Sequence, residues 1–110
     1  MKIIVFTQRV DVIASYGERR DCADQQIVEF IAACGFLPVP LPNNVDLAVR
    51  IVEQFSPAGI ILTGGNSLVK YGGTAPERDA TDKAMIEHVA SSCDNTDKKY
   101  IEPIVAYING

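Results

Sequence analysis

The sequence predicts an α/β fold in which helices flank a parallel sheet of about four strands. Short apolar segments alternate along the chain with segments whose apolar residues recur every three or four positions. One segment, Gly59–Leu62, is apolar throughout, as strands buried on both faces usually are. The chain has 110 residues and is 47% hydrophobic, which is enough for one core. We therefore expect a single domain over residues 1–110, built from right-handed crossover units.

The composition argues against several classes of protein. The net charge is −4 and no basic stripe occurs, so a nucleic-acid surface is not expected. No apolar run reaches the length of a membrane span, and the N-terminal apolar stretch is too short for a signal peptide. Cys22, Cys34 and Cys93 are odd in number and lack CxxC spacing, and there is one histidine. We expect a cytoplasmic protein with reduced thiols, no disulfide, no metal and no cofactor.

The first elements are a strand, a long connection and a helix. Lys2–Phe6 is the strand, and Thr7–Arg20 reads as a polar connection that is either functional or loosely ordered. The helix covers Cys22–Cys34, is capped by Asp21 or a neighbour, and ends at Gly35. Its predicted buried stripe has helical spacing and consists of Ile27, Phe30, Ile31 and Cys34.

A second strand and a second helix follow. Phe36–Leu41 is the strand, and its prolines, Pro38 and Pro40, favour the edge of a sheet, where a missing N–H costs little. Asn44 caps a helix that runs to about Phe55 and is ended by Ser56 and Pro57. Its predicted apolar face comprises Leu47, Ala48, Ile51, Val52 and Phe55.

The Gly59–Leu62 strand leads into a glycine-rich loop and a third helix. We expect Asp79 to cap that helix, which runs to about Ser91 and buries Met85, Ile86 and Val89. His88 lies beside this stripe, and we expect it to be a surface residue and not a catalytic one. Residues 94–102 read as a solvated polar loop, and Ile104–Ile108 reads as the last strand.

The loop from Thr63 to Asn66 has two interpretations. It stands where the strand's carboxyl end opens, the position at which open α/β sheets bind ligands. Gly64 and Gly65 either form a turn that needs positive φ or let backbone amides approach a developing oxyanion. The spacing alone favours the turn.

Several stretches, taken together, resemble one protein family. They are TQRVD after the first strand, SYGERRD before the first helix, GFLPVPLPN, GIILTGGN, and YGG followed by PERDAT. On these motifs, within about residues 1–90, the chain resembles the γ-glutamyl hydrolase (peptidase C26) branch of the class I glutamine amidotransferase-like family. It is most similar to members associated with nucleotide-activated amidates and surface-sugar biosynthesis.

The resemblance implies a flavodoxin-like, three-layer α/β/α fold and hydrolysis of a γ-glutamyl amide by a Cys–His–Glu triad. The implied substrate is a γ-glutamyl or glutamine-like small molecule. A thiolate attacks the γ-carboxamide, the histidine moves protons, and backbone amides hold the oxyanion. By position, Gly64 and Gly65 match the oxyanion-hole loop, with Gly65 as the amide donor. Matches near the substrate entrance are Arg9, Tyr16, Arg19, Asn66 and Tyr71.

The sequence departs from the family at the nucleophile. The family's next strand ends in a G-x-C-x-G elbow, whereas here PIVAYING carries Ile108 at the cysteine position. The sequence as given ends at Gly110, before the helix and the His–Glu pair that the family adds. Cys22, Cys34 and Cys93 do not stand on a strand-to-helix elbow. We therefore expect a truncated N-terminal portion of the family domain that has no activity by itself.

Two alternatives come from other classes. In the first alternative, the chain is an oligomerisation module that forms a homodimer through an exposed sheet edge and apolar surface. In the second, it binds a small anion through the Thr63–Asn66 loop.

Overall fold

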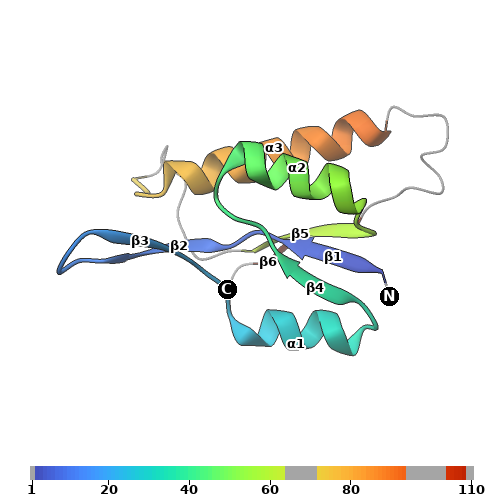
Figure 1. The fold of residues 1–110 in the computed structure, drawn as a ribbon, viewed down its shortest axis with the longest axis horizontal. Coiled ribbons are helices and arrows are strands. Elements are labelled where there is room, and N and C mark those ends of the chain that lie inside the picture. The colour runs from blue at the N-terminus through green and yellow to red at the C-terminus, as the bar shows by residue number, and fades with distance from the viewer. Residues whose placement is uncertain (1, 64–71, 94–103, 109–110) are drawn as a thin grey trace.

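The structure, a computed structural model, describes residues 2–63, 72–93 and 104–108, and the side chains of 2–63 and 72–91 (Figure 1). Helices α1 (Gln25–Ala33), α2 (Val45–Phe55) and α3 (Pro76–Cys93) alternate with strands β1 (Ile3–Phe6), β4 (Leu37–Pro40), β5 (Gly59–Thr63) and β6 (Ile104–Ile108). Strands β2 (Arg9–Ile13) and β3 (Glu18–Cys22) form a separate hairpin between β1 and α1. No helix in this part of the chain is long and apolar enough to cross a membrane.

The main sheet is parallel and has β1 and β5 at its centre. Its order is β4-β1-β5-β6, with Ile3 opposite Leu37, Ile4 opposite Gly59, and Gly59 opposite Ile104. All five residues of β5 are buried, as its uniform apolar run predicts. The predicted α/β class with a parallel sheet is thus confirmed.

Helices lie on opposite faces of this sheet, with α2 and α3 on one side and α1 on the other (Figure 1). Because side chains alternate along a strand, the apolar runs of β1 and β5 divide between two clusters. Val5, Ile60 and Leu62 pack with residues of α2 and α3. The other cluster, on the side of α1, consists of Ile4, Phe6, Ile31 and Ile61.

The helix ends are set by local capping. The Asn44 side chain accepts a hydrogen bond from Leu47 N at 3.1 Å, which confirms the predicted cap of α2. The cap of α1 is Asp24, whose Oδ1 accepts from Gln26 N at 2.8 Å. Asp79 is not the cap of α3, because the helix begins three residues earlier, at Pro76. Proline suits a first helical position, where its missing N–H needs no partner.

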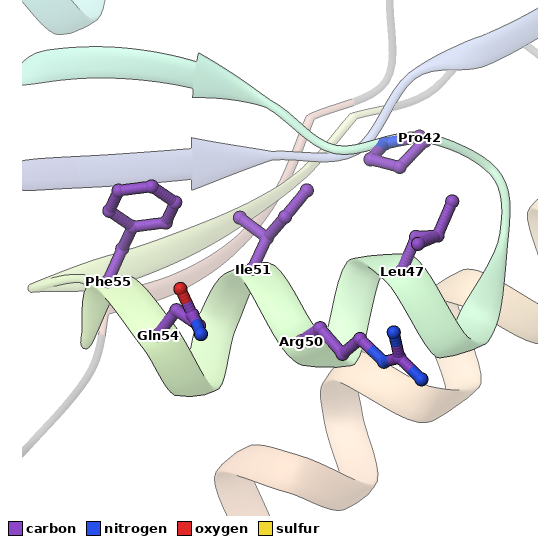
Figure 2. A pocket seen from close by; sticks show the side chains of 6 residues that line it. All are labelled: Pro42, Leu47, Arg50, Ile51, Gln54 and Phe55. Carbon is purple, nitrogen blue, oxygen red and sulfur yellow. The ribbon is translucent and has the colours of Figure 1, made fainter.

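The predicted apolar stripes are only partly buried. Ile31, Ala48, Val52 and Met85 are buried, whereas five predicted core residues are exposed: Phe30, Cys34, Leu47, Phe55 and Ile86. The reason is geometric: each helix turns only an arc of its surface to the sheet, and side chains at the rim of that arc extend into solvent. On α2, Leu47, Ile51 and Phe55 point to one side of the helix and border an open hollow of about 290 Å³ with Pro42, Arg50 and Gln54 (Figure 2).

The predicted connection Thr7–Arg20 is wrong in its main part, since it contains the β2–β3 hairpin. Arg9 pairs with Cys22 and Ile13 with Glu18. The turn between the strands is closed by Gly17 N, which donates to Ile13 O at 2.7 Å, and Gly17 has a φ of 70°. The hairpin projects from the end of the sheet at which α3 begins (Figure 1).

The position of β4 at the edge of the sheet is confirmed, and its prolines shape that edge. Leu37 N and Leu41 N donate to Lys2 O and Phe6 O, each at 2.8 Å, so alternate nitrogens of this segment face β1. Pro38 and Pro40 occupy the alternate positions, at which the backbone nitrogens face away from β1. The outer edge of β4 therefore lacks two of the donors that a further strand would need.

Replacing both prolines (Pro38→Val and Pro40→Val) is expected to promote self-association, because it restores outward N–H groups on a strand-forming segment. Light scattering over a wide concentration range measures this. Pro42→Val is the control, since Pro42 lies beyond the strand. A double variant that keeps the particle size of the parent would contradict this account of the edge.

Leu62 and Leu47 form a matched pair for testing the core. Leu62 is 5% exposed and Leu47 is 48% exposed. Leu62→Ala is expected to lower the free energy of unfolding by about 2–5 kcal/mol, through lost burial and a residual cavity. Leu47→Ala is expected to change it by no more than about 0.5 kcal/mol. Urea titration gives both values, and equal losses would show that β5 is not the centre of the core.

Candidate functional site

The candidate site lies where β1 and β5 end side by side. Thr7 directly follows β1, and Thr63 is the last residue of β5; both are buried. Thr63 N donates to Thr7 Oγ1 at 3.0 Å, and Thr63 Oγ1 donates to Thr7 O at 2.6 Å. Thr7 N donates to Ile61 O at 3.0 Å. These bonds fix the two strand ends at the position where the glycine-rich stretch begins.

A buried arginine of α3 reaches the same point. Arg78 is 3% exposed, and its Nη2 donates to Thr63 Oγ1 at 3.3 Å. Its Nε donates to Asp82 Oδ2 at 3.0 Å, one helical turn further along α3. The first turns of α3 are therefore attached to the carboxyl end of β5 by the hydrogen bond from Arg78 to the Thr63 hydroxyl, while the Arg78–Asp82 ion pair lies within α3 itself.

The carboxyl of Asp82 is held in a poorly hydrated place. Burial raises its pKa above the ordinary value of 3.8, and the Arg78 guanidinium together with the Thr7 hydroxyl only partly offsets this effect. Its other oxygen, Oδ1, is buried without a hydrogen-bond partner among the described residues. Because the pKa of Asp82 is higher in the folded state, protonation of this carboxyl favours folding. Its contribution to the free energy of unfolding therefore falls as the pH rises from 3.8 through the higher folded-state pKa.

The hairpin is attached to the start of α3 through Arg19. Its guanidinium donates to both carboxylate oxygens of Glu77 at 2.7 Å and to Thr74 O at 2.9 Å. The hydrogen bonds from Arg19 lower the pKa of Glu77 below its ordinary value of 4.5. This contact therefore stabilises the fold above that ordinary pKa, and the contribution is lost as the pH falls through the lower folded-state value.

The hairpin is also attached on the side of β4. Asp21 accepts from Asn43 N at 3.1 Å and from Asn43 Nδ2 at 2.8 Å. The same Nδ2 donates to Gln8 O at 2.9 Å, and Gln8 Nε2 donates to Leu41 O at 2.8 Å. The segment between β4 and α2 is thus hydrogen-bonded both to Gln8, just before β2, and to Asp21, on β3.

The structure places three of the sequence-predicted site residues on the hairpin, and it does not bring them together. Arg9 is exposed and pairs with Asp11 at 3.2 Å, and Tyr16 stands at the tip, where its hydroxyl accepts from Arg20 Nη2 at 3.0 Å. Arg19 is engaged with Glu77. Ile108 is the last residue of β6, opposite Thr63. The remaining predicted residues lie outside the described part of the chain: Gly64, Gly65, Asn66 and Tyr71.

The anion-binding alternative depends on this same loop, of which only Thr63 is described, and it stays a prediction. The polar loop predicted at 94–102 also lies outside the described residues.

The cysteines do not form a catalytic centre in the described part of the chain. Cys22 is half-buried on β3, and burial raises its pKa, which disfavours the reactive thiolate. Cys34 is exposed at the end of α1, so the prediction that it is buried is wrong. The side chain of Cys93 is not among those that the structure describes. Among the described residues, no group of His, Cys, Asp and Glu side chains is placed to hold a metal ion.

Sequence reasoning missed the polar residues that are central to this arrangement, Thr7, Arg78 and Asp82. The spacing of Arg78 and Asp82, four residues apart on a helix, was the one available signal, and it is also common on exposed helix faces. Burial of the pair became visible only with the packing of α3 against β5.

Comparison of the chain with models of protein families and with curated proteins gave no match.

Arg78→Met is expected to lower the free energy of unfolding by about 3–5 kcal/mol near neutral pH, because it leaves the Asp82 carboxylate buried without its cation. The loss should shrink as the pH falls toward the raised pKa of Asp82, where the carboxyl is neutral. Urea titrations at two pH values measure it. The double variant Arg78→Met with Asp82→Asn should recover part of the stability, and a double variant no more stable than the single would contradict the pairing.

Proposed function

We propose that this chain is the N-terminal portion of a class I glutamine amidotransferase-like domain of the γ-glutamyl hydrolase branch, and that it does not hydrolyse γ-glutamyl amides by itself. The proposed architecture is the family's flavodoxin-like, three-layer sheet. Support comes from the sequence motifs together with the parallel sheet, whose central strand β5 leads directly into the glycine-rich stretch.

The observation that carries the proposal is the register of β6 against β5. The two strands run parallel, and Ile108 is the residue opposite Thr63. Thr63 immediately precedes Gly64 and Gly65, the stretch that resembles the oxyanion loop. A nucleophile elbow at the end of β6 would therefore begin beside Thr63, the residue from which the glycine stretch continues, and the proposed attack on a carboxamide needs its oxyanion donors close to the nucleophile.

The proposed inactivity follows from the chemistry of residue 108. Formation of a thioester needs a thiolate to attack the γ-carbonyl carbon and a proton donor for the departing ammonia. Isoleucine offers no lone pair, so the first bond cannot form. The thiol of Cys22 is on the hairpin with a raised pKa, and Cys34 is on the outer end of α1, so neither substitutes for it.

Arg9 and Tyr16 remain the proposed contacts for a γ-glutamyl or glutamine-like ligand, since both side chains are exposed on the hairpin. The role of Arg19 within this proposal changes. Its guanidinium makes three hydrogen bonds to Thr74 and Glu77. We therefore assign Arg19 to holding the hairpin against the start of α3, and not to contacting the ligand.

The purified chain is expected to release no glutamate from glutamine or from a γ-glutamyl amide, measured by coupled detection of glutamate and ammonia. Gly65→Pro and Gly65→Ala are the matched variants, because proline removes the proposed amide donor and alanine keeps it. Turnover that survives Gly65→Ala and is lost in Gly65→Pro would contradict the inactivity.

Family membership is tested separately from activity. The source gene is read beyond the Gly110 codon in all three frames. A cysteine elbow followed by a distant His-x-Glu supports the proposal, and the absence of both contradicts it and favours a binding or assembly module.

A further inference from the structure

Helix α2 carries a row of apolar side chains that the rest of the protein leaves partly uncovered. Leu47, Ile51 and Phe55 are four residues apart and point to one side of the helix, beside Pro42 at the end of β4 (Figure 2). Leu47 is 48% exposed and Phe55 is 57% exposed, and both border the open hollow of about 290 Å³. Large apolar side chains gathered around a surface hollow are typical of a contact with another molecule.

Phe55 also borders a second hollow, of about 300 Å³, at the amino end of the sheet. The other residues that line it are Lys2, Ile3, Ser56 and Ala58. The residues that line the two hollows form one surface, the α2 strip. From Leu47 to Phe55 it follows α2 for eight residues, or roughly 12 Å.

The α2 strip is basic although the chain as a whole is acidic. Arg50 lines the first hollow and Lys2 the second, and neither hollow has Asp or Glu among the described residues that line it. The chain has 14 acidic residues against 10 basic ones. The acidic residues of α2, Asp46 and Glu53, lie roughly 140–160° around the helix axis from Ile51, away from the first hollow.

Arg50 is available to a charge from outside the chain. It is exposed, and its side chain makes no ion pair or hydrogen bond with another residue of the described part of the chain. Gln54 lies one turn further along α2 and adds amide groups on the same side (Figure 2). A carboxylate beside Arg50 would therefore meet a cation without an intramolecular competitor.

The composition of the first hollow matches the centre of a protein–protein interface. Such centres are enriched in aromatic residues and Arg and depleted in Lys, Asp and Glu. Here Arg50 is the one charged residue among the six that line the hollow. A small ligand in so open a hollow leaves the outer sides of Leu47 and Phe55 in water, whereas a partner protein covers both.

The geometry favours a helix as the contacting element. Side chains at intervals of four residues form the ridge that packs into the groove of another helix. Addition of a strand beside the strip is disfavoured, because Pro38 and Pro40 remove donors from the outer edge of β4. A second copy of the chain suits the strip poorly, because a twofold contact brings two copies of Arg50 into an interface that lacks acidic lining residues.

We propose that the α2 strip is the docking surface for an acidic amphipathic helix of another protein. Apolar side chains of that helix fill the hollows on either side of Phe55, and its carboxylates pair with Arg50 and Lys2. This inference does not depend on the proposed γ-glutamyl chemistry.

A synthetic peptide labelled with fluorescein tests the surface, with binding followed by fluorescence anisotropy. The probe is a helix of about 18 residues, roughly five turns, with leucines along one face and glutamates on both flanks of that face. A second probe carries lysine at every glutamate position. The glutamate probe is expected to bind at least about fivefold more tightly than the lysine probe. The net charge of −4 would by itself favour the lysine probe, so this order reports on the strip.

Two variants locate the binding. Arg50→Glu is expected to reverse the order of the two probes, because it replaces the available cation by an anion. Phe55→Ser is expected to weaken binding of the glutamate probe by about fivefold or more. Phe30→Ser is the matched control and should leave binding unchanged, since Phe30 is 58% exposed but lies on α1, on the other side of the sheet (Figure 1).

The comparison of the two probes on the parent chain needs no variant, so it stands even where a variant fails to fold. Failure of the glutamate probe to bind, or equal binding of both probes, would overturn the proposal. An equal loss in Phe30→Ser and Phe55→Ser would do so as well, because it indicates nonspecific adsorption to exposed aromatic side chains. A dimer of the parent chain that Phe55→Ser dissociates, measured by light scattering, would assign the strip to a second copy and contradict a foreign partner.

Discussion

Strands β1 and β5 are enclosed on both faces, and most of the architecture follows from that enclosure. A strand with apolar side chains on both faces needs a covering layer above and below, so α1 must lie opposite α2 and α3. Parallel pairing then obliges each connection to cross the sheet through a helix and brings all the carboxyl ends to one end of it. The position of the candidate site is therefore a result of core packing and not of any residue within the site.

The enclosure also explains why a charged side chain is buried at that end. The backbone and hydroxyl groups of Thr7 and Thr63 are removed from water where the sheet stops, and each needs a partner. The two threonines satisfy each other, and Arg78 adds a donor to Thr63. Burying a guanidinium requires a counter-charge, which Asp82 supplies from the next turn of α3. A polar network of this kind ties the orientation of α3 to the end of β5.

Local chemistry made the central parts of the fold predictable. The apolar run of β5, the Asn44 cap and the edge prolines each depend on a few adjacent residues, and all three agree with the structure. The hairpin was missed although Arg9, Val10, Asp11 and Val12 of β2 alternate polar and apolar, because that alternation is short and its partner β3 is almost wholly charged and shows none. The exposure of Phe30 and Phe55 and the burial of Arg78 were not predictable from helical periodicity, because each depends on how far a helix overhangs the sheet. The glycine loop at the centre of the predicted site belongs to the residues that are not described.

The hairpin turn gives the molecule a place that can be altered at little cost to its core. Residues 14–17 lie between paired strands, all of them exposed, while the strands themselves are bound to the body at Arg19 and Asp21. Exposed tips with fixed bases are the positions at which chains best accept inserted sequence. A fluorophore, an epitope or an entire folded domain can therefore be grafted between Ala14 and Gly17, with the parallel sheet serving as an undisturbed carrier.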